Sequence, residues 1–332
     1  MSSPRAGRAR RLLPPGSRRA RQRDRDLQQY VVYLAFALIL GAFAVILRND
    51  GFLSSANLLN IGRQAAPIAV MAVGMTFALA AAEIDLSVGS VVALSSLVAA
   101  EVVTAAGFWA GTLAAVGVGL AAGLVNGVVA VKVRIPSFLV TLGMLGVISG
   151  VARNMNNLQS YPIRNDRFSA VFGAGSAGPV SSLLIWTVVA LVVGHVALRH
   201  LRWGRHVLAT GANREAANAL GIRTDRVRIG ALVASATAAA FAGVLLAGRL
   251  AIGRHDLGEN DLLTVIAAVV IGGTSLFGGR GSVAGAVVGA AIMAMLNNGL
   301  ILMGLRVADQ MIARGVIIVL AVALSMRERR ET

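Results

Sequence analysis

The chain has 332 residues, of which 56% are hydrophobic and only 14% are charged, and it contains no cysteine. Soluble domains carry roughly 25% charged residues, so this composition excludes an ordinary soluble enzyme and predicts an integral membrane protein. The lack of cysteine excludes disulfides and thiolate metal sites, and the four histidines show no ligand spacing with acids, so we expect no metal centre.

The first 30 residues hold nine arginines, against Asp24 and Asp26, and no apolar segment. A secretory signal peptide would need such a segment and a cleavage site. We therefore interpret residues 1–30 as a basic, disordered cytoplasmic tail. The net charge of +16 then serves orientation at the membrane, because nucleic-acid binding would need a basic face with aromatic platforms that the sequence lacks.

Long apolar stretches recur after this tail. They cover 31–47, 65–82, 84–100, 109–131, 135–152, 183–198, 229–248, 262–277, 283–303 and 309–326. Most reach the roughly 17–25 residues that a helix needs to cross a bilayer. The sequence therefore predicts an all-α fold, a polytopic membrane helix bundle with about ten transmembrane helices over residues 31–326. One of the stretches around residues 65–100 could be a broken or re-entrant helix.

The basic residues predict how the bundle is oriented. With ten crossings and the tail inside, the inner segments are 1–30, 132–134, 199–228, Arg280 and 327–332, and they hold 22 of the 31 Lys and Arg residues. Cytoplasmic loops of membrane proteins are enriched in these residues. We therefore expect both termini to be cytoplasmic, including a short tail over residues 327–332.

Residues 81–90 read Ala-Ala-Glu-Ile-Asp-Leu-Ser-Val-Gly-Ser and place two carboxylates between apolar runs. A charge at membrane depth costs roughly 2.5–3.5 kcal/mol, so Glu83 and Asp85 indicate a protein-lined site or a helix break. A short loop at the membrane edge is the alternative interpretation. Both interpretations remain open from the sequence.

The cytoplasmic loop 199–228 contains a second informative pattern. Asn213 is suited to cap a helix, Glu215, Ala216 and Ala217 favour helix, and Gly221 can end it in the left-handed conformation. A short helix across the cytoplasmic mouth is suited to docking into the groove of another protein. An ordinary linker helix is the alternative.

Glycine-rich stretches mark three further places. Small residues four apart in 117–123 and 281–289 predict close helix packing, either within one subunit or at a dimer seam. The stretch Gly272–Ser282 lacks the Gly-Lys-Ser/Thr ending of a phosphate-binding loop. We interpret it as a tight cytoplasmic turn between two spans, with no nucleotide bound.

From about residue 30 to its end, the chain resembles the permease subunits of bacterial ABC importers, in the branch serving ribose, xylose and similar monosaccharides. Five blocks carry the resemblance: 83–90, Asn126-Gly127 with 135–143, Gly211–Ile222, 266–276 and 297–299. The chain departs from ribose-type members at 258–264, where many have a Tyr-Glu-Leu-Asp-like run. The wording of 83–85 and 276–281 is closer to xylose-type members, which favours a pentose.

The resemblance implies a transport subunit of the bacterial plasma (inner) membrane, with no enzyme activity of its own. Its implied partners are cytosolic ATPases that bind ATP and Mg²⁺, an extracytoplasmic sugar-binding protein and a second permease copy, giving a homodimer; this chain would bind no cofactor. Loop 199–228 would be the coupling loop that docks the ATPase, through Gly211, Asn213, Glu215, Ala216, Ala217 and Gly221. The translocation path or its motif would involve Glu83, Asp85, Ser87, Asn126, Thr141, Asn297 and Asn298, although each polar residue also suits a helix–helix hydrogen bond.

Two other transporters and an enzyme compete with this interpretation. Glu83 and Asp85 could form the ion site of an ion-coupled secondary transporter. An ABC permease for branched-chain amino acids shares the architecture. A membrane enzyme ranks third, because the sequence shows no nucleophile–base pair or cofactor motif.

Overall fold

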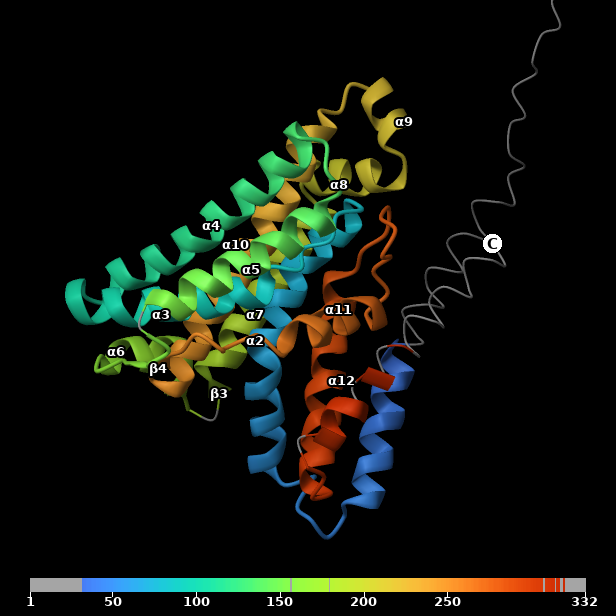
Figure 1. The fold of residues 1–332 in the computed structure, drawn as a ribbon. Helices are drawn as coiled ribbons and strands as arrows, with labels where there is room; N and C mark the ends of the chain where they lie inside the picture. Colours follow the sequence, from blue (N-terminus) through green and yellow to red (C-terminus); the bar gives the residue numbers. More distant parts are fainter. Residues whose placement is uncertain are drawn as a thin grey trace, which may run out of the picture.

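The computed structural model describes residues 32–319, except 156, 179, 307, 314, 317 and 318 (Figure 1). Its helices are Val32–Ile46, α2 (Ser55–Ala80), α3 (Val88–Ala106), α4 (Phe108–Lys132), α5 (Ser137–Met155), α6 (Asp166–Ser169), the π-helix η1 (Ala170–Ala174), α7 (Ser182–Arg199), α8 (Arg202–Ala212), α9 (Arg214–Ala219), α10 (Thr224–Leu250), α11 (Asp261–Ile271) and α12 (Val283–Leu302). Residues 308–313 are also helical. The predicted tails 1–30 and 327–332, and much of the predicted span 309–326, lie outside the described residues.

Seven helices in this part of the chain, α2, α3, α4, α5, α7, α10 and α12, are long and apolar enough to cross a membrane. This confirms a polytopic helical membrane protein. The predicted span 262–277 is helical only as α11, whose 11 residues rise about 16 Å, short of the roughly 30 Å of hydrocarbon. The reason is local, since Gly273, Gly278 and Gly279 all have positive φ and turn the chain into a loop before α12.

The centre of the bundle is α10, which packs against α2, α3 and α4. Small residues make these close approaches possible. A Cβ at Gly123 of α4 would lie 2.6 Å from the Cα of Val233, and one at Gly74 of α2 would lie 2.4 Å from the Cβ of Ala238. In the second predicted small-residue run, Gly285 and Gly289 of α12 likewise face the backbone of α11. Gly119 and Gly123 of the first run, and Gly285 and Gly289 of the second, therefore serve packing within this chain.

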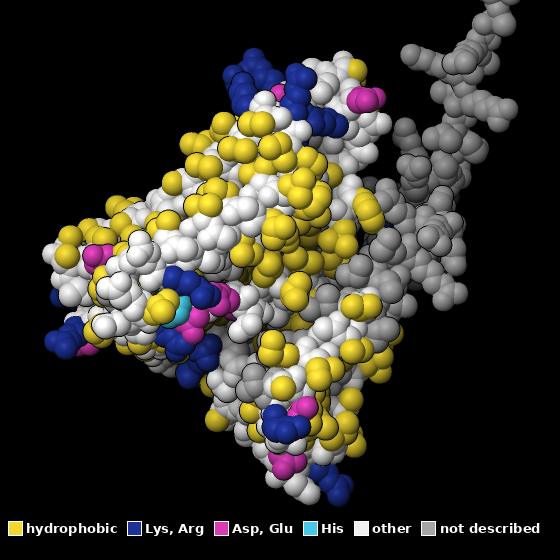
Figure 2. Space-filling model, viewed as in Figure 1, with side chains coloured by type: hydrophobic (Ala, Val, Ile, Leu, Met, Phe, Trp, Pro, Cys, Tyr) yellow, Lys and Arg dark blue, Asp and Glu magenta, His cyan; other side chains and the backbone are white. Residues whose placement is uncertain are grey.

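The outer surface of the bundle is apolar. Of the membrane-length helices, α5 and α7 are the least covered, with 17% and 22% of their apolar windows buried. Figure 2 shows hydrophobic side chains spread over α4 and α5, and Lys and Arg gathered at the end that holds α8 and α9. An apolar belt between polar ends is the surface that a bilayer requires.

The end opposite α8 and α9 is closed by short elements. Strand β1 (Tyr161–Pro162) pairs antiparallel with β4 (Ile252–Gly253), and β2 (Ser176–Ala177) pairs antiparallel with β3 (Val180–Ser181). Beneath them a cluster of aromatic rings joins α4, η1, α7 and α10: Phe108, Phe172, Trp186 and Phe241 lie with neighbouring centroids 5.0–6.0 Å apart. This cluster fixes the loop region onto the bundle.

Candidate functional site

The acidic motif lies at a break between two helices. α2 ends at Ala80, residues 83–87 are not helical, and α3 begins at Val88. Two side chains of α5 satisfy the exposed backbone: Ser137 Oγ accepts from Ile84 N–H (3.1 Å), and Thr141 Oγ1 accepts from Leu86 N–H (3.0 Å) and donates to the Ile84 carbonyl (3.1 Å). These bonds satisfy backbone groups that are buried at the break and have no helical partner.

Asp85 organises the second half of the break. Its side chain is fully buried and one carboxylate oxygen accepts from the backbone N–H (3.0 Å) and the hydroxyl (2.6 Å) of Ser87. The amide of Asn126, from α4, donates to the same Ser87 hydroxyl (2.9 Å). The other carboxylate oxygen of Asp85 and the carbonyl oxygen of Asn126 are buried without a partner among the described residues. The structure thus joins four predicted residues, Asp85, Ser87, Asn126 and Thr141, around one segment.

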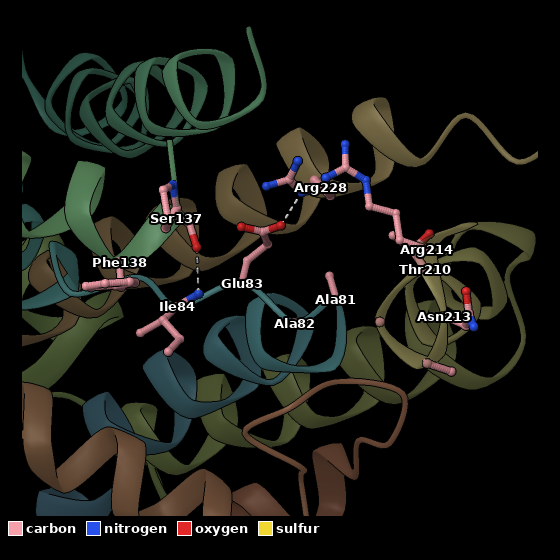
Figure 3. A pocket seen from close by; sticks show the side chains of 13 residues that line it. Ala81, Ala82, Glu83, Ile84, Ser137, Phe138, Thr210, Asn213, Arg214 and Arg228 are labelled. Carbon is pink, nitrogen blue, oxygen red and sulfur yellow. Dashed lines mark hydrogen bonds and ion pairs between the residues drawn. The ribbon is translucent and has the colours of Figure 1, made fainter. Parts of the chain in front are cut away.

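Glu83 forms a buried ion pair with Arg228, in the first turns of α10 (Figure 3). The exposed fractions of the two side chains are 5% and 11%. A buried pair of this kind is sensitive to the loss of either partner, because the remaining charge is left without compensation. The pair therefore binds the motif to the start of the central helix.

This ion pair borders a cavity of about 390 Å³. The cavity is lined by the motif (Ala81–Ile84), the start of α5 (Pro136–Phe138), the end of α8 and start of α9 (Thr210–Arg214), and Arg228. Figure 3 shows Glu83 between Ser137 on one side and Arg228 on the other. Asp85, Ser87, Asn126 and Thr141 are enclosed by protein and do not line it.

The short helix predicted in loop 199–228 is present as α9. The side chain of Asn213 accepts from Ala216 N–H (2.9 Å) as its N-cap, and Gly221 ends the turn with φ +81°. Gly221 N–H donates to the Asn218 carbonyl (2.9 Å) and Ile222 N–H to that of Ala217 (3.1 Å), which is the Schellman pattern. Glu215 and Ala216 are exposed, Ala217 is buried, and Leu220 is 82% exposed. The helix therefore presents a surface to a partner.

Asn297 and Asn298 lie apart from the motif. Asn298 exchanges two amide hydrogen bonds with Asn57 (3.0 and 2.9 Å) near the start of α2, whereas the motif follows the end of that helix. The 26 residues of α2 span about 39 Å at 1.5 Å per residue. Asn298 therefore joins α12 to α2 at the opposite end of the molecule.

Sequence reasoning did not single out Ser137 or Arg228. Ser137 was noticed only inside a longer motif, and Arg228 was one of several basic residues in loop 199–228. One signal was available for Arg228, because it is the last charged residue before the apolar run that begins at Ile229.

These features define a multi-pass helical membrane protein with a polar helix break beside a short, capped and exposed helix. The family model for "Branched-chain amino acid transport system / permease component" matches residues 57–322, and the chain belongs to this family of ABC transporter permeases. It is therefore a transport subunit of the bacterial inner membrane and not itself an enzyme.

Curated relatives match over most of their length. The ribose import permease protein RbsC of Escherichia coli (strain K12) is 35% identical over 298 residues, 88% of this chain and 92% of the relative. RbsC of Bacillus subtilis (strain 168) is 35% identical over 298 residues, covering 87% and 92%. The L-arabinose ABC transporter permease protein AraH of Azospirillum brasilense is 36% identical over 286 residues, covering 84% and 83%. No solved structure shows a significant match.

Proposed function

We propose that this chain is the membrane-spanning permease of an ATP-driven importer for a monosaccharide, and that the sugar is a pentose. The observation that carries the proposal is the end-to-end similarity to permeases named for ribose and L-arabinose, which are both pentoses. The residues at 83–85 and 276–281 resemble those of xylose-type members, which adds xylose as a candidate. ATP and Mg²⁺ belong to the partner ATPase in this scheme, and this chain binds no cofactor.

The proposed topology has about ten spans with both termini cytoplasmic. The long helices alternate in direction, so that the break 83–87, loop 133–136 and α8–α9 share one end, which carries Lys132, Arg134, Arg202, Arg205, Arg223 and Arg226. Positive-inside enrichment supports a cytoplasmic location for this end. Tails 1–30 and 327–332 would lie on the same side.

The proposed assembly is a homodimer that encloses the path. On α5, Gly143, Gly146 and Gly150 have no heavy atom within 4 Å of the position that a Cβ would occupy, so a second helix can approach this face closely. The extracytoplasmic binding protein would deliver sugar to the opposite end, at β1–β4 and the neighbouring loops. The cytosolic ATPase would dock on α9 and switch the path between inward- and outward-facing states.

Within this scheme Glu83, Asp85, Ser87, Asn126 and Thr141 form the motif beside the path. Asp85 and Asn126 are enclosed by protein, so in this scheme they hold the shape of the break, whereas Glu83 borders the cavity. Asn297 and Asn298 can take part only near the outer end.

The test is uptake into proteoliposomes that contain this chain, its ATPase and its binding protein, with and without internal ATP. Labelled ribose, L-arabinose and xylose are compared with leucine, because the family description names branched-chain amino acids. We expect pentose uptake that needs ATP and both partners. ATP-dependent leucine uptake would favour the amino-acid permease. Uptake by this chain alone, driven by an ion gradient, would make Glu83 and Asp85 an ion site and overturn the proposal.

Glu215→Arg tests the docking surface. Glu215 is exposed on α9, so the charge reversal should leave folding unchanged and weaken ATPase binding about tenfold. The measurement is titration of the purified ATPase against permease in nanodiscs. Glu101→Arg, an exposed glutamate near the end of α3, is the matched control. Equal ATPase affinity for both variants would show that α9 is not the docking helix.

A further inference from the structure

Three segments from distant parts of the sequence meet backbone to backbone beside the motif. They are the end of α2 with its following turn (Ala80–Ala82), the end of α8 (Gly211–Ala212) and the loop before α12 (Gly278–Gly279). We call this contact the glycine junction.

The geometry of the glycine junction leaves no room for side chains. A Cβ at Gly211 would lie 1.9 Å from the Ala80 carbonyl oxygen, and one at Gly279 would lie 2.8 Å from the Cα of Ala212. Gly279 N–H also donates a hydrogen bond to the Ala80 carbonyl (3.0 Å). Close-packed backbones cannot slide past one another without strain, so a shift of one segment displaces the other two.

The turn that follows α2 stores strain at this point. Ala82 N–H donates to the Leu79 carbonyl and Glu83 N–H to that of Ala78, both at 2.9 Å, which closes a Schellman turn. The left-handed position of this turn is usually glycine, but here it is Ala82, with φ +61°. A non-glycine residue in this conformation costs roughly 1–2 kcal/mol, so the turn is held by its surroundings.

The same segment, residues 202–228, contacts the motif at a second point. After α8 the chain passes through α9 and enters α10, where Arg228 pairs with Glu83. Segment 202–228 therefore contacts the N-terminal side of the break twice, through the glycine junction just before Glu83 and through the ion pair at Glu83. The cavity of Figure 3 borders both attachments, since Ala81, Gly211 and Arg228 are among the residues that line it.

We propose that the glycine junction transmits displacement of α8 and α9 to the break 83–87, with Gly211 as its main positioning residue. This inference rests on the proposed function, because it assigns the route by which ATPase docking moves the path. In this proposal the loop 272–282 does more than connect two helices, because it holds the end of α2 against the end of α8.

The decisive variant is Gly211→Ala, measured as sugar imported per ATP hydrolysed in proteoliposomes with both partners. We expect ATPase association and hydrolysis to persist while uptake per ATP falls about tenfold, because α8 and the end of α2 can no longer keep their contact. A purely structural role would lower hydrolysis and uptake in parallel. Gly117→Ala is the control, because a Cβ there meets no atom within 4 Å.

Ala82→Gly is the second variant, and it adds no bulk. It suits the left-handed turn, so the protein should fold at least as well as the wild type. The looser turn should still lower uptake per ATP by about threefold. Uptake per ATP at the wild-type value in Ala82→Gly would contradict the proposed role of the glycine junction. This test remains valid even if Gly211→Ala fails to assemble. ATP-independent uptake by the wild-type system would instead overturn the proposed function, so the two failures are distinguishable.

Discussion

Two ion pairs of the same chemistry lie at opposite ends of this protein. At the end that holds α8 and α9, Glu83 and Arg228 are almost fully buried. At the opposite end Arg153 and Glu259 form a 2.6 Å pair whose side chains are 50% and 33% exposed. Both pairs join distant segments, but only the first has been removed from water. The loss of one partner should therefore strongly destabilise the buried pair, whereas the exposed pair should contribute little to stability.

The buried pair predicts the largest effect. Arg228→Met leaves the Glu83 carboxylate uncompensated, so we expect a loss of about 3–5 kcal/mol in the free energy of unfolding. Thermal unfolding of the purified protein in detergent measures this loss. The double variant Glu83→Gln with Arg228→Met removes both charges and should recover most of it. If the single and double variants unfold together, the pair does not carry the stability that its burial implies.

Asp85, whose carboxylate is hydrogen-bonded close to this ion pair, should give the second-largest effect on stability. Asp85→Ala removes the acceptor of two bonds from Ser87, which should cost about 1–3 kcal/mol and leave the start of α3 disordered. We expect normal membrane insertion and loss of uptake.

Ser90→Ala is the matched control for Asp85→Ala, because Ser90 Oγ donates only to the Ser87 carbonyl within the first turn of α3 (2.8 Å). Uptake should remain near the wild-type value in this variant. Wild-type uptake by Asp85→Ala itself would make the break a passive loop.

The end that holds α8 and α9 also shows what the sequence could predict. A helix break was one of the two interpretations that two acids in an apolar run allowed, and α9 followed from Asn213 and Gly221, because caps are local chemistry. The side chains that pair with polar groups of the break could not be predicted from local sequence. Ser137 and Arg228 lie 53 and 145 residues from their partners. Local patterns cannot reveal which distant side chain completes a buried polar group.

The predicted length of the span 262–277 was wrong, and the sequence also did not reveal where Asn298 lies. Hydropathy counts the apolar residues of 262–277 and does not register that Gly273 and Gly278 break the helix through positive φ. Asn298 suited a polar path, but its partner Asn57 is 241 residues away, and that pairing places it at the other end of the bundle. Packing between remote segments decided the place of Asn298, whereas the local backbone conformation at Gly273 and Gly278 decided the length of α11.

The exposed pair should respond weakly. Arg153→Ala removes a solvent-screened partner, so we expect a loss of at most about 1 kcal/mol, and less at high salt. The same thermal assay, repeated at low and high ionic strength, checks this. A loss of unfolding free energy as large as that of Arg228→Met would mean that the Arg153–Glu259 pair is shielded from water in the assembled protein. The two ion pairs would then not differ in the way proposed.

The smallest effect concerns the loop between α10 and α11. The Arg254 guanidinium, whose Nε donates to Asp256 (2.8 Å), lowers the pKa of that exposed carboxyl below its ordinary value. A depressed folded-state pKa contributes stability above the unfolded pKa of about 3.9, and this contribution is lost as the pH falls through the folded pKa. The thermal midpoints of wild type and Asp256→Asn should therefore differ by a constant amount from about pH 5 to 8 and converge in acid. A difference that instead changed between pH 6 and 8 would assign the dependence to another group, because neither partner of this pair titrates there.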